Sequence, residues 1–268
     1  MSETIDHRDL DLAYQAVARD PKYVHFVNIP ERIVRCLDHF GVVFDRVAVI
    51  DKLHAYYLFI GVVDHAIDSG AAGVGKIIFE RLGNRVLSFE KDTRDSDVKL
   101  VTNILKREIS DDAYPLIIDN LRELYQEVVS ERAAKSIESY IQHRKAVGRL
   151  TAEQSYLLIR SLLDAENAGV CRFMQQVGEV GCLVDSMIDL GPDDRLGLLG
   201  FKPTMMDFAN LSLCTLRAGL GIWVRHLRLT KLFFEAIVDN IRDRFRTQQS
   251  FVAPSLVNNR KDEAASVA

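Results

Sequence analysis

The sequence predicts an all-α protein, built as a single-domain helical bundle. Three observations support this fold class. Apolar residues recur at intervals of three and four along most of the chain, which is the helical period. Only six prolines occur in 268 residues, and they separate long periodic segments. Strand-like alternation is nearly absent, and a chain of this length with 48% apolar residues can bury one sizeable core.

Proline and glycine mark the predicted helices in the first half of the chain. Pro30 followed by Glu31 is a typical helix start, because proline is favoured in the first turn. A glycine-rich segment at 69–75 ends a second, longer and strongly apolar helix. The helices of this half are expected over about 30–40, 44–69, 76–82 and 96–109.

The second half of the chain shows the same helical period. Gly191 and Pro192 are expected to end the helix that carries a second apolar stretch. Helices are expected over about 115–134, 135–165, 169–190 and 204–246, the last divided in two near Gly219 and Gly221. The helical domain is therefore predicted over 31–246, between an N-terminal extension (1–30) and a polar C-terminal tail (247–268).

Charge and cysteine content exclude some classes of protein. The formal net charge of -4 gives no basic footprint for nucleic acid. The four cysteines are widely spaced and form no CxxC motif, so we expect free thiols and a cytoplasmic protein. The acidic, polar N-terminus does not resemble a signal peptide, and no apolar run reaches the ~20 residues of a membrane span. Peripheral contact with a membrane, through an apolar substrate, and assembly as a homodimer remain open.

Two pairs of aspartates share one spacing. Asp64 and Asp68 follow an apolar run, and Asp185 and Asp189 close another, with Asp193 one further turn on. A spacing of four places both carboxylates of a pair on one helical face, where like charges repel. Proteins hold Mg²⁺ through one or two carboxylates together with substrate phosphates. The pairs therefore predict two facing helices that hold Mg²⁺ against a diphosphate; the alternative is that each pair is a solvated helix face.

The residues around both pairs resemble the squalene and phytoene synthase family. Residues 57–68 (YLFIGVVDHAID) are similar to its first motif, in which a tyrosine and a phenylalanine precede the aspartate pair. Residues 176–193 are similar to its second motif, and residues 201–203 (FKP) lie near a tyrosine-leucine-proline of the family. The resemblance spans about 31–208 and implies a helical fold of the class I terpenoid synthase type. It also implies Mg²⁺-dependent ionisation of a prenyl diphosphate, such as farnesyl or geranylgeranyl diphosphate, with these aspartates as catalytic metal ligands.

The sequence departs from the family pattern at several positions. Gly61 stands where the family has an arginine, and His65 replaces a frequent aspartate. The basic run that follows Asp193 in the family is reduced to Arg195. Cyclases of the wider superfamily carry an arginine some forty residues before their second motif, and Arg144 lies at that distance in a similar tyrosine-x-x-x-arginine stretch.

Candidate substrate-binding residues are cations and aromatic side chains near these motifs. Cations would donate charge-assisted hydrogen bonds to phosphate oxygens, and aromatic faces would stabilise a carbocation in a dry cavity. The candidates are Arg144, Lys145 and Arg225 as cations, with Tyr57, Phe59, Tyr156, Phe173, Phe208 and Trp223 as cavity lining. The simpler alternatives are exposed helix cations and ordinary core aromatics.

Three functions follow from these observations. The first is a Mg²⁺-dependent enzyme of the squalene/phytoene synthase type that joins two prenyl diphosphates head to head. The second is a terpene cyclase of the same superfamily that acts on one prenyl diphosphate, which Gly61 and Arg144 favour. The third is a non-catalytic helical assembly protein that keeps the fold, although the retained aspartates argue against it.

Overall fold

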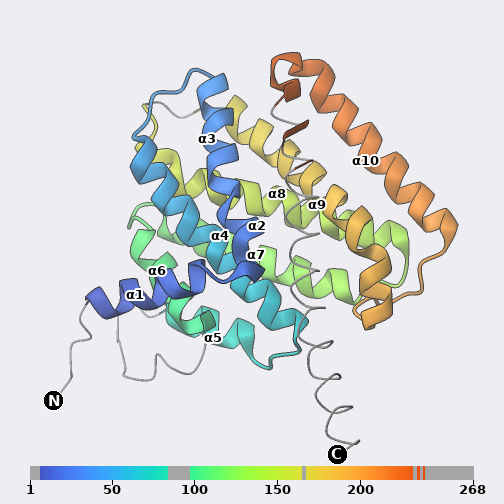
Figure 1. Ribbon diagram of the computed structural model, residues 1–268, viewed down its shortest axis with the longest axis horizontal. Coiled ribbons are helices and arrows are strands. Elements are labelled where there is room, and N and C mark those ends of the chain that lie inside the picture. The colour runs from blue at the N-terminus through green and yellow to red at the C-terminus, as the bar shows by residue number, and fades with distance from the viewer. Residues whose placement is uncertain (1–6, 84–96, 165–166, 232–233, 236–237, 239–268) are drawn as a thin grey trace, which may run out of the picture.

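Helices make up almost all of the computed structural model (Figure 1), which describes residues 7–83, 97–164, 167–231, 234–235 and 238. In chain order the α-helices are α1 (His7–Ala18), α2 (Val24–Val27), α3 (Ile29–His39), α4 (Arg46–Asp68), α5 (Val74–Gly83), α6 (Asp97–Glu108), α7 (Tyr114–Arg132), α8 (Ile137–Ile159), α9 (Ala168–Leu196) and α10 (Met205–Arg225). Short 3-10 helices are η1 (Pro21–Tyr23), η3 (Arg160–Leu162) and η4 (Leu227–Leu229). Within the described ranges no strand forms, so the predicted all-α class is confirmed.

Helices α4 and α8 connect the rest of the bundle. α8 packs along α7 and α9 and also contacts α4, while α4 packs against α2, α3, α5 and α6. The side chains of Leu53, Leu58, Leu105, Ile117 and Ile159 are fully buried in one cluster, so α4, α6, α7 and α8 share the main core. α10 lies at the edge of the bundle, where it packs mainly against α9 (Figure 1).

The two helices that carry the aspartate pairs begin at side-chain caps. The Asp45 carboxylate accepts hydrogen bonds from the backbone N–H groups two and three residues later, at 3.0 and 3.1 Å. Asn167 caps α9 in the same way, again at 3.0 and 3.1 Å. Such caps satisfy N–H groups that have no partner inside the helix, and typically contribute about 1 kcal/mol each. Local sequence therefore fixes where α4 and α9 start.

The predicted bounds agree with the observed helices in the first half of the chain and differ in the second. Helices α3 to α7 begin and end within two residues of the expected positions. α8 ends earlier than expected, at Ile159, and η3 follows it. α10 is not divided near Gly219 and Gly221, as the sequence suggested, but runs unbroken to Arg225. Glycine lowers helix propensity without forbidding the helix, and tertiary packing overrides it here.

α9 is longer than predicted, because Pro192 lies inside the helix instead of ending it. Proline lacks an N–H group and so removes one hydrogen bond, to the carbonyl four residues earlier, but the chain continues helical to Leu196. The helix ends at Gly197, whose φ of 69° is the left-handed conformation that glycine adopts at helix C-termini. The consequence is that Asp193 belongs to the same helix as Asp185 and Asp189.

Helices α8 and α9 cross in close contact at a pair of glycines. A Cβ atom added to Gly148 would lie 2.2 Å from the carbonyl oxygen of Gly178, and one added to Gly178 would lie 2.2 Å from the carbonyl oxygen of Gly148. Both distances are far below any van der Waals contact, so only glycine permits this approach. Arg144 lies one turn before this crossing on α8, and Asp185 two turns after it on α9, so the crossing sets how these side chains meet.

The N-terminal segment packs onto the bundle from α1 onward. Tyr23 is buried in the main core, and α2 packs against α4. Residues 1–6 of the predicted extension and the predicted tail over 247–268 lie outside the described residues. None of the helices described in the structure is both long enough and apolar enough to span a membrane.

Candidate functional site

A cavity of about 690 Å³ lies among α4, α7, α8 and α9, with α2 and α5 completing its walls. The predicted aspartates all line it: Asp64 and Asp68 from α4, and Asp185, Asp189 and Asp193 from α9. The structure therefore brings together two carboxylate pairs that are more than a hundred residues apart in sequence. Asp64 and Asp68 are solvent-exposed at this cavity, whereas Asp185, Asp189 and Asp193 are half-buried in its wall.

The cavity has a polar mouth and an apolar interior. Arg132, the last residue of α7, contacts Asp68, the last residue of α4, so both helices end at the mouth. The preceding turns of these helices supply apolar lining. These residues are Phe59, Ile60 and Val63 from α4, and Leu121, Leu124 and Val128 from α7. Phe26, Phe79 and Val147 add to the same lining from neighbouring helices. An amphipathic ligand with a charged head and an apolar tail would match both regions.

The carboxylates at the mouth repel one another, which makes their ionised forms less favourable. Desolvation within the protein, followed by repulsion from Asp68, raises the pKa of Asp64 to about 7. The Asp64 side chain is accessible from the cavity, but the protein around it replaces most of its hydration, which is why desolvation is the larger cause. Desolvation and then repulsion from Asp189 and Asp68 raise the pKa of Asp193 to about 6. Cations bound among these carboxylates would relieve both effects.

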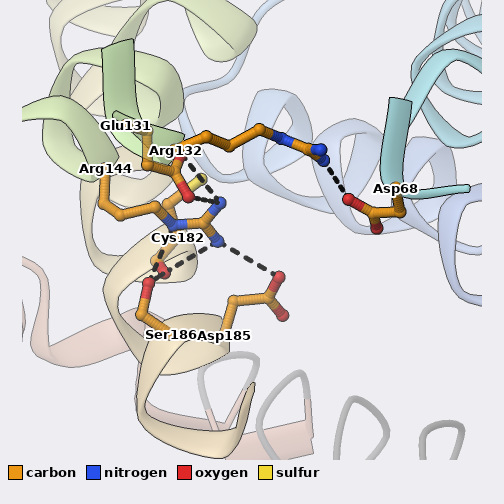
Figure 2. Close-up of polar contacts among 7 residues, drawn as sticks. All are labelled: Asp68, Glu131, Arg132, Arg144, Cys182, Asp185 and Ser186. Atoms are coloured by element: carbon orange, nitrogen blue, oxygen red, sulfur yellow. Dashed lines mark hydrogen bonds and ion pairs between the residues drawn. The ribbon is translucent and has the colours of Figure 1, made fainter. Parts of the chain in front are cut away.

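Arg144 links three helices below the mouth (Figure 2). Its Nε donates to Ser186 Oγ at 2.8 Å, and its Nη1 lies 3.4 Å from both carboxylate oxygens of Glu131. Its Nη2 lies 3.3 Å from the Cys182 carbonyl oxygen and 3.5 Å from Asp185 Oδ2. Every nitrogen of the guanidinium group thus has a protein acceptor. The main effect of Arg144 in this state is to hold Asp185 and Ser186 in place relative to α7 and α8.

Arg144 and Glu131 form an ion pair inside the protein, so each charge compensates the other. Desolvation raises the pKa of Glu131, and the nearby Arg144 charge lowers it in part. Desolvation acts to lower the pKa of Arg144, but Glu131 and Asp185 outweigh this effect and raise it well above its usual value. Arg144 therefore stays charged beside the cavity. Removing one member of such a pair leaves an uncompensated buried charge, which is strongly destabilising.

Arg132 is a site residue that sequence reasoning missed. Its Nη1 donates to the Ile67 carbonyl oxygen at 3.0 Å, and its Nη2 donates to the Asp68 carboxylate. Figure 2 shows that Glu131 and Arg132, although adjacent, point to different partners: Glu131 toward Arg144 and Arg132 toward Asp68. No local pattern marks this arginine, because a charged pair at a helix end usually faces solvent. Its contact with Asp68 becomes apparent only in the structure, where the C-terminal ends of α4 and α7 lie together.

Gly61 has a structural explanation. A Cβ atom at this position would lie 2.6 Å from the Phe26 ring, which itself lines the cavity. The ring therefore occupies the direction in which an arginine side chain at position 61 would leave the helix. An arginine here would require the Phe26 ring to move, so glycine at this position is coupled to the packing of the N-terminal segment. A second arginine, Arg132, lines the cavity instead.

Several predicted site residues have other roles. Phe59 lines the cavity as expected. Tyr57 hydrogen-bonds Ser155 at 3.0 Å inside the core, and the Tyr156 hydroxyl accepts from the Asn167 N–H at 3.0 Å. The remaining candidates are Lys145, Phe173, Arg225, Phe208 and Trp223, and like Tyr57 and Tyr156 they are not among the described residues that line the cavity. They are core or surface residues of the helices, which was the simpler alternative.

Phe173 and Arg225 illustrate why helical spacing alone misplaced these candidates. The Phe173 ring packs against His226 with ring centroids 4.6 Å apart, and against Phe40 at 5.1 Å, in a satellite cluster. Arg225 is exposed at the end of α10, the helix at the edge of the bundle. Proximity to a motif in sequence therefore did not bring either residue to the cavity.

The donor set of the cavity suits a hard divalent cation that is completed by substrate oxygens. Among the described residues, no three His, Cys, Asp or Glu side chains converge to hold a metal ion by themselves. Mg²⁺ commonly takes only one or two carboxylates and completes its shell with water and substrate phosphates.

Comparison of the chain with protein-family models, with curated proteins and with solved structures finds no match.

Proposed function

We propose that this protein is a Mg²⁺-dependent enzyme that ionises an allylic prenyl diphosphate, as class I terpenoid synthases do, with squalene/phytoene-synthase-like prenyl transfer as its reaction. One observation carries the proposal. Two aspartate pairs, from α4 and α9, face one cavity whose deeper walls are apolar. The acidic mouth suits a metal-bound diphosphate, and the apolar interior suits a hydrocarbon chain.

Asp64 and Asp68 would hold Mg²⁺ on one wall, and Asp185, Asp189 and Asp193 on the other. Bound there, the metal would neutralise the diphosphate as a leaving group without proton transfer. The carbon–oxygen bond between the prenyl chain and the diphosphate breaks, and its electron pair leaves with the diphosphate. The raised pKa values of Asp64 and Asp193 support this assignment, since charge that the surrounding protein disfavours becomes favourable beside a cation.

The remaining residues of the cavity would bind, orient and protect the substrate. Arg132 can turn from Asp68 toward the diphosphate, because its side chain is partly exposed at the mouth. Arg144, held by Glu131 and Ser186, keeps Asp185 oriented. The apolar walls exclude water that would quench a carbocation, and the buried Phe59 ring offers an aromatic face to positive charge.

A terpene cyclase of the same superfamily is the second candidate. The observation that favours it is the place of Arg144, which contacts Asp185 on the wall of the cavity. In a cyclase the same ionisation would be followed by ring closure within one chain instead of attack by a second prenyl diphosphate.

Incubation of the purified protein with farnesyl or geranylgeranyl diphosphate and Mg²⁺ tests the proposal. We expect release of diphosphate and formation of a hydrocarbon product, both abolished when a chelator removes the metal. A product with twice the carbon number of the substrate indicates head-to-head coupling, and one with the same carbon number indicates cyclisation. Absence of diphosphate release with either substrate would contradict the proposal and favour a non-catalytic helical assembly protein.

Substitution of Arg132 tests the residue that sequence reasoning missed. Arg132→Gln should weaken binding of free diphosphate in the presence of Mg²⁺ by roughly 10- to 100-fold, because a charge-assisted hydrogen bond contributes about 1.5–3 kcal/mol. Titration calorimetry measures this binding without requiring turnover. Arg149→Gln, at an exposed position on α8, is the matched control and should bind diphosphate as the unaltered protein does. Equal affinities for both variants would remove Arg132 from the site.

A further inference from the structure

The outward face of α10 is apolar, although it faces solvent. Seven large apolar side chains on this helix are 41–85% exposed, which is unusual for such residues. They are Met205, Met206, Leu213, Leu216, Leu220, Trp223 and Val224. The opposite face of the helix is the buried one: Leu211, Thr215 and Ile222 pack inward. The core therefore accounts for one side of α10 and leaves a second apolar side exposed, on which Trp223 donates a hydrogen bond to Thr230 Oγ1 at 2.7 Å.

The exposed residues form one continuous stripe. Leu213, Leu216, Leu220 and Trp223 are spaced by three and four residues, which places them on the same side of the helix. With a rise of 1.5 Å per residue, a helix of this length presents a strip roughly 30 Å long. Figure 1 shows α10 at the edge of the bundle, where it packs mainly against α9. Single exposed apolar residues are ordinary on a protein surface, but a contiguous strip marks an interaction site.

The charges beside this stripe are almost all positive. Between residues 205 and 231 the sequence has four basic residues, Arg217, Arg225, Arg228 and Lys231, and all four are exposed, although Lys231 also forms an ion pair with Glu235 at 3.8 Å. The one acidic residue of the segment, Asp207, is occupied in capping the start of α10 through hydrogen bonds from Thr204. The chain as a whole carries a formal net charge of -4. The stripe is therefore a local basic and apolar surface on an acidic protein.

We propose that α10 docks the protein on an anionic lipid surface, with its apolar stripe in the interface and its arginines at the headgroups. A helix with an apolar face, flanking cations and a tryptophan is the pattern of a helix that lies in the plane of a membrane. Negatively charged lipids attract such cations. A second copy of the chain fits less well, because a symmetric contact would bring the basic flanks together with no acidic side chain on the stripe to pair with them.

The single tryptophan of the chain makes this proposal directly measurable. Trp223 lies on the stripe, so its fluorescence reports what covers α10 without any label. On addition of vesicles that contain phosphatidylglycerol, we expect the emission to shift to shorter wavelength and the protein to sediment with the vesicles. Vesicles of phosphatidylcholine alone should bind much less protein, and added salt should weaken binding to the anionic vesicles.

Paired substitutions separate the apolar contribution from the electrostatic one. Arg217→Gln with Arg228→Gln should weaken vesicle binding by roughly 10- to 30-fold, since each cation near an anionic surface contributes on the order of a fivefold factor. Leu213→Gln with Leu220→Gln should weaken binding and abolish the shift in Trp223 emission. Val43→Gln with Val47→Gln is the control, because these valines are similarly exposed but lie between α3 and α4 and in the first turn of α4. All the positions are exposed, so each variant should keep the melting temperature of the unaltered protein.

Two outcomes would overturn the proposal. One is that no vesicle changes the Trp223 emission or sediments the protein. The other is that the emission shifts with protein concentration in the absence of lipid while light scattering shows a doubled mass, which would assign the stripe to a second copy of the chain. Neither outcome depends on whether the cavity is catalytic.

Discussion

Asp64→Asn should lower the turnover of a prenyl diphosphate by at least ~100-fold, the size of effect seen when one strong electrostatic stabiliser is removed from an active site. Asparagine keeps the size of the side chain but removes the charge that would hold a cation. Asp64 lies one turn before Asp68 on α4, and both side chains are exposed at the cavity. The diphosphate would then be poorly neutralised as its bond to the prenyl chain breaks.

Loss of folding would not explain this result, because the substitution removes an unfavourable charge. Desolvation and repulsion already disfavour the ionised Asp64 in the folded state. The variant should therefore unfold at the same temperature as the unaltered protein, or at a higher one. Asp51→Asn, at an exposed position on the same helix, is the matched control and should keep full turnover. Turnover in Asp64→Asn equal to that of the control would eliminate the metal role of α4.

The part of the site that local spacing determines could be predicted from the sequence. Each aspartate pair lies on one helical face because four residues make about one turn. Apolar residues on the preceding turns indicated which way that face would point. The same reasoning predicted the bounds of α3 to α7 within two residues. These features depend on neighbours along the chain, which is the information that periodicity carries.

Features that depend on contacts between distant segments could not be predicted in this way. Arg132 joins the site because α7 and α4 end side by side, and nothing around residue 132 indicates this. In the sequence, Gly61 stands where the resembled motif has an arginine. In the structure, the Phe26 ring occupies the space that a side chain at position 61 would need. Pro192 was expected to end α9, but the helix tolerates one lost hydrogen bond.

The candidate site contains charges that the protein around them both disfavours and compensates. Asp64 is left in a position that disfavours its charge, while Arg144 has its charge balanced by Glu131 and Asp185. A site of this kind stays assembled only if the helices that carry it are held rigidly. In this protein the backbones of α8 and α9 meet at Gly148 and Gly178, a contact without polar side chains that lies beside the hydrogen bonds from Arg144 to α9. The packing of two glycines thus determines the geometry of charges one to two turns away.

Gly178→Ala should destabilise the protein by about 1–3 kcal/mol, although glycine to alanine within a helix ordinarily stabilises by up to ~1 kcal/mol. The added methyl group would lie 2.2 Å from the Gly148 carbonyl oxygen and 2.8 Å from the Ala152 side chain. Because the first of these atoms belongs to the backbone, α8 and α9 must move apart. The movement would lengthen the contacts of Arg144 with Ser186 and Asp185, so turnover should fall together with stability.

Gly181→Ala is the matched control, since it lies one turn further along α9, where an added methyl group would meet no described atom within 4 Å. It should leave turnover unchanged and keep or raise the free energy of unfolding, measured by urea titration. The difference between the two variants isolates the helix crossing from the general effect of replacing glycine in a helix. Equal unfolding free energies for Gly178→Ala and Gly181→Ala would show that the two helices do not meet as closely as their glycines indicate, and that another contact orients Arg144.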